Sequence, residues 1–199
     1  SYDIPDFEKT IVNNFLKKQI CGLILVSCQP DNWKFYYEHF TSAQKPIVLI
    51  DRNIHSLDAN FVSFDNYSIV HYMTRNLIDH QYKNIFLMSG PEQYTCESNC
   101  IEGFKAAFAE TELPLNPDAI ITTAASKEDA FRKTINIFKK EKPETIIATS
   151  ESIATGIIEG LNILGFSKQE IPVLSLGEEH WNLHTHSFAS MSAARPALK

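Results

Sequence analysis

The chain has 199 residues, of which 44% are hydrophobic and 21% charged, and its formal net charge is -6. This composition is typical of a globular protein of one large or two small domains, and no run approaches the roughly 18 apolar residues of a membrane span, so we expect no membrane partner. The acidic balance argues against this chain alone binding a phosphate backbone, because such binding needs clustered lysines and arginines.

Hydrophobic periodicity predicts helices and strands in alternation. Phe7, Ile11 and Phe15 recur at helical spacing, and residues 22–26 then form a run that is apolar on both faces, as in a buried parallel strand. The alternation continues with expected helices at 32–40, after 65–66, at 96–108, 126–138 and 153–164, and expected strands at 46–50, 61–64, 85–88, 119–123, 145–148 and 171–176. Ser126 with Asp129 predicts a capping box. The expected fold class is α/β, with parallel sheets covered on both faces and ligands at the carboxyl ends of the strands.

The common catalytic signatures are missing. The sequence has no G-x-G-x-x-G, Walker A, H-E-x-x-H or G-x-S-x-G motif, so we predict no catalytic residues and no enzyme. His180, His184 and His186 lie close together, but a solvated loop explains them better than a metal site, because no cysteine or acidic partner has a recognised spacing. Cys96 and Cys100 share a helical face, where thiols usually pack as small hydrophobic groups. We therefore predict no metal and no cofactor.

Polar residues stand directly after several expected strands. They are Ser27, Asp51, Arg52, Ser89, Thr149–Glu151 and Gly177–Glu179, with the aromatic residues Tyr94 and Trp181 nearby. Because the carboxyl ends of parallel strands meet at one edge, these groups are suited to hydrogen-bond a polyol or phosphosugar and to stack on its apolar face. The alternative is that each is a turn residue or a helix cap.

Four segments together resemble the effector-binding domain of the LacI/GalR transcriptional repressors. They are Pro46–Arg52, Phe64–Asn66 at a helix start, Asn84–Pro91 and Glu102–Phe108. The resemblance extends over essentially all of the chain. Within the family, Thr149–Ser150 and Gly177–Glu178 are similar to the branch that contains the fructose repressor (catabolite repressor/activator) and the sucrose-operon repressors.

The resemblance implies a periplasmic-binding-protein-like fold of type I, with two doubly wound parallel-sheet subdomains, truncated at both ends. Residues 1–64 with 187–199 would form the subdomain next to the DNA-binding headpiece, and residues 65–186 the other, with the effector in the cleft between them. The resemblance also implies a homodimer that binds operator DNA through an N-terminal helix-turn-helix absent from this chain. The aromatic residues at 33 and 35–37 fit either a dimer surface or a core.

The effector-binding residues follow from the same resemblance and from the polar strand ends. They are Ser27, Asp51, Arg52, Phe64, Cys100, Ser150, Glu178 and Trp181. Cys100 departs from the family, which usually presents an arginine there for sugar hydroxyls or phosphate. A thiol cannot replace that bidentate cation, so either Arg52 serves an anionic effector, or the effector is a neutral sugar, or the pocket has lost its usual ligand. We favour a neutral or weakly charged sugar.

These features predict the effector-sensing domain of a sugar-responsive transcriptional repressor. Four cysteines in 199 residues do not form the dense pattern of a disulfide-stabilised secreted fold. They favour a reducing compartment, so we expect a cytoplasmic protein. The main alternative is an extracytoplasmic sugar-binding protein of a transport system, which would share the fold. An enzyme on parallel α/β layers is a third and weaker alternative.

Overall fold

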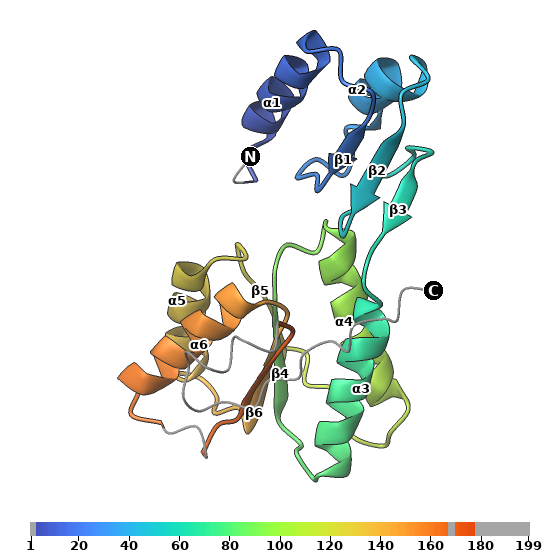
Figure 1. Ribbon diagram of the computed structural model, residues 1–199. Helices are drawn as coiled ribbons and strands as arrows, with labels where there is room; N and C mark the ends of the chain where they lie inside the picture. The colour runs from blue at the N-terminus through green and yellow to red at the C-terminus, as the bar shows by residue number, and fades with distance from the viewer. Residues whose placement is uncertain (1–2, 167–169, 178–199) are drawn as a thin grey trace. The chain divides into compact units, whose positions relative to one another are not determined.

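The computed structural model describes residues 3–166 and 170–177, which form two compact units (Figure 1). Unit 1 comprises Ser1–Phe64 with Gln93–Cys96, and unit 2 comprises Asp65–Glu92 with Glu97–Lys199. Each unit contains a parallel sheet with helices, so the expected α/β fold is confirmed. The expected return of residues 187–199 to the first subdomain lies outside the described residues.

Unit 1 is built on a three-stranded parallel sheet in the order β1-β2-β3. Its elements are α1 (Pro5–Lys17), β1 (Leu23–Leu25), α2 (Trp33–Tyr36), the π-helical turn η1 (Tyr37–Thr41), β2 (Ile47–Ile50) and β3 (Asn60–Val62). Its core joins Val12 of α1 and Phe40 of η1 to Leu49 of β2. Both helices therefore pack on the same face of the sheet.

The opposite face of this sheet is exposed, so the prediction that residues 22–26 form a strand buried on both sides was wrong. Ile24 is 71% exposed and Val62 is 59% exposed. The parallel register aligns Ile24 with Val48 and Ile50 with Val62, so these side chains share one face. No described element of unit 1 packs against this face, which is why the apolar run of β1 is buried on one side only.

The aromatic segment of α2 and η1 is mostly core. Tyr36 and Phe40 are fully buried, and Trp33 and Phe35 pack against the same cluster. Tyr37 is 47% exposed. Of the two expectations for this segment, the core is therefore the better description, and Tyr37 is its most exposed aromatic residue.

Unit 2 contains a four-stranded parallel sheet in the order β5-β4-β6-β7. Its elements are α3 (Asn66–Asp79), β4 (Ile85–Ser89), α4 (Thr95–Ala109), β5 (Ile120–Thr122), α5 (Lys127–Ile137), β6 (Thr145–Ala148), α6 (Glu151–Ile163) and β7 (Val173–Ser175). The helices α3 and α4 cover one face of the sheet, and α5 and α6 cover the other (Figure 1). Every residue of β4 and β6 is buried, as predicted for a sheet covered on both faces.

The strand order creates a topological switch point between β4 and β6. From β4 the chain continues to β5 on one side and then crosses to β6 on the other. In open parallel sheets the loops diverge at such a point and leave a crevice at the carboxyl ends of the strands. This edge of unit 2 is therefore where a ligand site is expected.

The predicted caps at the starts of α3 and α5 are both present, but the predicted capping box at α5 is incomplete. The Asp65 carboxylate accepts from Ser68 N–H at the start of α3, and the Ser126 hydroxyl accepts from Asp129 N–H at the start of α5. Asp129 does not return a bond to Ser126 but accepts from Ala124 N–H at 2.9 Å. The capping box is thus half formed, because the chain turns back and presents an earlier N–H.

In the described part of the chain, the helices are all too short or too polar to traverse a lipid bilayer.

Candidate functional site

A buried carboxylate lies at the switch-point edge of unit 2. Glu97, in the first turn of α4, is 9% exposed. Its Oε2 accepts hydrogen bonds from Gly90 N–H at 2.9 Å and from the Thr149 hydroxyl at 2.7 Å. Because Gly90 follows β4 and Thr149 follows β6, Glu97 bridges the two diverging strands. Both bonds are accepted by the same carboxylate oxygen, so Glu97 joins the turn after β4 to the end of β6.

Other polar groups gather at the same edge. Ser150 begins α6, and its hydroxyl accepts from Ile153 N–H at 3.4 Å. After β7, the chain passes so near Glu151 that a Cβ on Gly177 would lie 2.7 Å from the Glu151 Cγ. Ser89, the last residue of β4, is fully buried, and its hydroxyl has no hydrogen-bond partner among the described residues. The edge therefore combines hydroxyl and carboxylate groups.

In unit 1, Arg52 follows β2 and forms an ion pair with Asp3, so its guanidinium is not a free cation. Arg52 donates from Nη1 and Nη2 to the Asp3 carboxylate at 2.8 and 3.1 Å, and its guanidinium lies 3.9 Å from the centre of the Tyr94 ring. Burial lowers the pKa of Arg52, but the hydrogen bond and charge of Asp3 outweigh it and raise that pKa. Asp51 has a positive φ of 64°, which turns the chain sharply after the strand. Both terminal nitrogens of Arg52 thus already bind the Asp3 carboxylate.

Ser27, which follows β1, belongs to a buried network around Glu8. Glu8 is 2% exposed, and its carboxylate accepts from the Ser27 hydroxyl at 2.8 Å, Cys28 N–H at 2.7 Å, the Gln29 amide at 3.1 Å and the Tyr36 hydroxyl. Burial raises the pKa of Glu8, but the hydrogen bonds, led by that of Tyr36, lower it overall. The Ser27 hydroxyl also accepts from Gln29 N–H at 3.0 Å. The network holds the loop after β1 against α1.

Comparison with known proteins identifies the family. Residues 3–179 match the family described as periplasmic binding proteins and sugar binding domain of LacI family. The chain belongs to this family. The match spans both units and therefore agrees with the resemblance drawn from the sequence.

Curated relatives cover nearly the whole of this LacI-type domain. It is 25% identical over 188 residues to the HTH-type transcriptional repressor PurR of Histophilus somni strain 129Pt, which is 94% of this chain and 55% of that protein. It is 26% identical over 184 residues to catabolite control protein A of Priestia megaterium, which is 85% of this chain and 54% of that protein. The chain spans about half the length of the curated relatives it matches.

Solved structures share the fold at low identity. The transcription regulator CcpA of Lactococcus lactis superposes with a TM-score of 0.81 at 15% identity, over 94% of this chain and 68% of that one. The Cra transcriptional dual regulator from Pseudomonas putida, solved in complex with fructose 1-phosphate, gives a TM-score of 0.81 at 17% identity, over 96% of this chain and 70% of that one. These similarities establish the LacI-type fold.

The predicted effector residues of the domain lie in different environments. Asp51 and Arg52 follow β2 in unit 1, and Ser150 lies beside Thr149 at the unit 2 edge. Phe64 is 53% exposed, whereas Cys100 is 2% exposed and belongs to the unit 2 core. Glu178 and Trp181, like the three histidines considered as metal ligands, lie outside the described residues. Their roles in effector binding stay predictions.

The sequence reasoning missed Glu8 and Glu97. In α4 the helical spacing places Glu97 on the same buried face as Cys100 and Phe104, whereas Cys96 is only half-buried at its flank. In α1, Glu8 shares the buried face with Val12. The sequence pattern that could have revealed them is a glutamate at the helical spacing of the buried apolar residues. Such a glutamate indicates a hydrogen-bonded site, because burial of a carboxylate requires dedicated hydrogen-bond donors.

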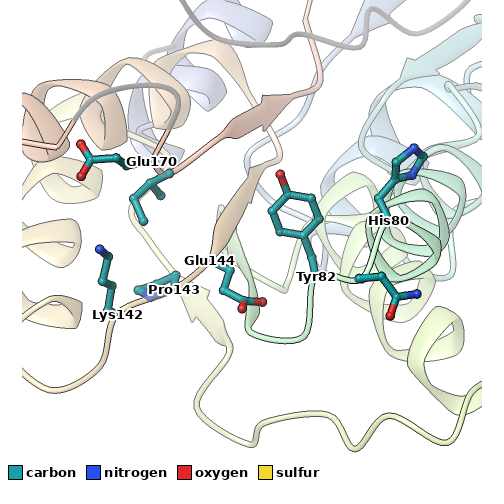
Figure 2. A pocket seen from close by; sticks show the side chains of 8 residues that line it. His80, Tyr82, Lys142, Pro143, Glu144 and Glu170 are labelled. Carbon is teal, nitrogen blue, oxygen red and sulfur yellow. The ribbon is translucent and has the colours of Figure 1, made fainter.

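The pocket shown in Figure 2 lies at the opposite, amino-end edge of unit 2. It has a volume of about 380 Å³ and includes Tyr82, Lys142 and Glu144 but no predicted effector residue. The Glu144 carboxylate accepts from the N–H groups of Lys83 and Asn84 at 2.6 and 3.0 Å, and these bonds lower its pKa. Glu144 thus ties the segments that precede β4 and β6. Among the described residues, no group of three or more potential metal ligands is clustered.

The cysteines are expected to react with thiol reagents at very different rates. Cys21 is exposed, whereas Cys28 is buried and burial, followed by Glu8, raises its pKa to about 12. Only about one Cys28 thiol in 10,000 is therefore ionised at pH 8. Timed labelling with an aromatic disulfide, followed by peptide mass spectrometry, should modify Cys21 first and Cys28 only on unfolding. Cys21→Ser should remove the fastest phase, and equal rates at the two sites would contradict the described packing.

Proposed function

We propose that this chain is the effector-sensing domain of a sugar-responsive transcriptional repressor. Its curated relatives include proteins named as HTH-type repressors and as catabolite control protein A, which supports this role over that of a transport protein or an enzyme. Operator DNA would be bound by a helix-turn-helix outside this chain, in a cytoplasmic homodimer. The exposed apolar side chains of Ile4, which precedes α1, and of Phe7 and Phe15 on α1 support a partner surface on unit 1.

The observation that carries the proposal is the polar edge of unit 2 at its switch point. Gly90, Glu97 and Thr149 are joined there by hydrogen bonds, and Ser150 begins the next helix beside them. Parallel α/β sheets bind ligands in this position, and carboxylates and hydroxyls are groups that hydrogen-bond sugars. We propose that Asp51 and Ser150 contact the effector, with Phe64 and Trp181 stacking on its ring.

We further propose that the effector is a small sugar or sugar phosphate of the kind recognised by the fructose and sucrose repressor branch. The pair Thr149–Ser150 and the Gly177–Glu178 pair support this assignment. The close approach of Gly177 to Glu151 gives a physical reason for glycine there, because a larger residue would displace the Glu151 side chain. The effector must bind one state of the repressor more tightly than the other, since only differential affinity can shift operator binding.

A thermal-shift titration of the 199-residue chain tests the proposed sugar binding. Sucrose, fructose and their phosphates are the probes, and the true effector at a hundredfold excess over its Kd should add about 2.7 kcal/mol of stability. Asp51→Asn should lose this shift, because it removes a charge at the carboxyl end of β2 while asparagine tolerates the positive φ of that position.

Asp58→Asn is the matched control. Asp58 is an exposed carboxylate that precedes β3 at the amino end of the sheet, so its loss should leave the ligand shift intact. If neither sugars nor sugar phosphates stabilise the chain, the proposed function is wrong. Upstream sequence separates the two binding roles: a helix-turn-helix and hinge support the repressor, and a leader peptide supports the transport protein.

A further inference from the structure

Arg52 lies at the carboxyl end of β2 in surroundings suited to the recognition of an oxyanion. Its guanidinium lies over the Tyr94 ring, 3.9 Å from the ring centre, and both residues belong to unit 1. Tyr94 is 6% exposed, and the Arg52 side chain is 16% exposed. The planar fork of an arginine matches the two oxygens of a carboxylate or a phosphate, and contact with an aromatic face restricts its movement.

The oxyanion bound to Arg52 belongs to the chain itself. The Asp3 carboxylate accepts from Arg52 Nη1 at 2.8 Å and from Nη2 at 3.1 Å, with one bond to each of its oxygens. The Asp3 side chain is 48% exposed, whereas the guanidinium beneath it is largely buried. This two-point geometry is the one by which arginine binds carboxylate and phosphate groups of ligands. Asp3 therefore occupies the position that a ligand anion would take.

Two features indicate that Asp3 can be displaced from Arg52. An ion pair with a half-exposed partner contributes little net stability, because water and salt compete with it. Asp3 also has a positive φ of 57°, a backbone conformation that costs energy in a residue other than glycine. The first described bonds of α1 are accepted by the Ile4 carbonyl oxygen, so Asp3 can leave Arg52 without breaking them.

Arg52 has a further donor that Asp3 does not use. Its Nε is buried and has no hydrogen-bond partner among the residues that the structure describes. A phosphate monoester offers three strong acceptor oxygens, whereas a carboxylate offers two. The hydrogen-bonding capacity of Arg52 therefore exceeds what Asp3 supplies.

We propose that Arg52 is an oxyanion-binding residue for which Asp3 is a competing internal ligand, so that the N-terminal segment opposes the binding of a phosphate group at the carboxyl end of β2. A neutral sugar at this strand end does not face that competition. The inference deepens the proposed function, because it concerns the ligand specificity of the strand end that carries Asp51. Its test uses inorganic phosphate and does not require that a sugar binds.

Thermal unfolding of the 199-residue chain in a series of phosphate concentrations tests this competition, with sodium chloride at matched ionic strength as the reference. The dependence of Tm on phosphate concentration gives the phosphate affinity by mass action. Asp3→Asn removes the competing charge and its repulsion of phosphate, and asparagine tolerates the positive φ of this position. We expect Asp3→Asn to raise the phosphate affinity by about tenfold.

Asp6→Asn is the matched control, because it makes the same change of charge at an exposed carboxylate in the first turn of α1. The described hydrogen bond to Asp6, from the Thr10 hydroxyl at 2.8 Å, is accepted by the main-chain oxygen, which the substitution keeps. Asp6→Asn should leave the phosphate affinity unchanged. Combining Asp3→Asn with Arg52→Gln should abolish the gain, because the fork is then missing.

Far-UV circular dichroism establishes that each variant is folded. If Asp3→Asn is not folded, Asp3→Gly replaces it with the same readout, because glycine also permits the positive φ.

The outcomes separate the inference from the proposed function. A gain in phosphate affinity that is specific to Asp3→Asn and depends on Arg52 supports the inference. An unchanged affinity in Asp3→Asn, an equal gain in Asp6→Asn, or a gain that persists without Arg52 overturns it. Fructose and sucrose are titrated in the same assay: if neither they nor their phosphates stabilise the wild-type chain, the proposed function fails, while the phosphate result still decides the inference.

Discussion

Replacing Glu8 with alanine is expected to lower the free energy of unfolding by about 3–5 kcal/mol. The substitution leaves buried donors without an acceptor, namely the hydroxyls of Ser27 and Tyr36, the Cys28 N–H and the Gln29 amide. Each unsatisfied buried donor costs about 1–3 kcal/mol. Urea denaturation followed by circular dichroism measures the loss.

Glu38→Ala is the control for this substitution, because Glu38 is exposed in the same unit. It should change the free energy of unfolding by no more than about 0.5 kcal/mol. A Glu8→Ala variant as stable as Glu38→Ala would mean that the carboxylate does not hold the loop after β1.

The same network predicts a dependence on pH with a definite sign. The folded-state pKa of Glu8 lies below its ordinary value of 4.5, so its stabilising contribution is fully present above pH 4.5 and is lost as pH falls through the folded-state pKa. The variant Glu8→Gln has no titrating group at this position. The stability difference between wild type and Glu8→Gln should therefore shrink on acidification below pH 4.5.

Gly156→Ala is expected to be the most damaging glycine substitution tested in unit 2, with a loss of about 3 kcal/mol or more. A Cβ at this position of α6 would collide with the Lys127 carbonyl oxygen and come within 2.8 Å of the Ala130 Cβ, both on α5. The helices would have to separate. Alanine is favoured over glycine in a helix by about 1 kcal/mol, so a loss of stability cannot arise from helix propensity.

Gly165→Ala provides the comparison. Gly165 has a φ of 81° and nothing within 4 Å of the position of a Cβ, so alanine there should cost only the backbone strain of about 1–2 kcal/mol. Thermal and urea unfolding of both variants measure the difference. A Gly156→Ala chain that is more stable than wild type would contradict the close contact of α5 and α6.

The order and type of the main elements could be predicted because they depend on neighbours in sequence. The apolar runs of β4 and β6 are local patterns and appear as buried strands. The spacing of Ile69, Met73 and Leu77 in α3 is also local, and of these Met73 and Leu77 are buried while Ile69 is partly buried against the same core. The start of α3 at Asp65 is equally local, since its carboxylate bonds to an N–H three residues away. The same reasoning was wrong for β1, because exposure of Ile24 depends on which element covers the sheet.

The site was predicted less completely, for a related reason. Polar residues after strands predicted an effector site that includes Ser150, and this stays a prediction. Ser27, however, is 1% exposed and bonded to Glu8, and Cys100 packs in the core. Neither outcome can be read from strand ends, because a hydroxyl that follows a strand can face solvent or a partner on another helix. Glu8 lies 19 residues from Ser27, and no pattern within that interval predicts their contact.

The sequence by itself determined the alternation of helices and parallel strands, the carboxyl-end position of polar residues and the resemblance to the LacI family, since periodicity, turn chemistry and motif order are written along the chain. Only the tertiary structure decided that Glu97 is buried between Gly90 and Thr149 and that Arg52 is paired with Asp3. Thr149 lies 52 residues from Glu97, and Arg52 lies 49 residues from Asp3. Pairing of β4 with β6 and folding of the N-terminal segment bring these partners together, and no pattern local in the sequence records that proximity.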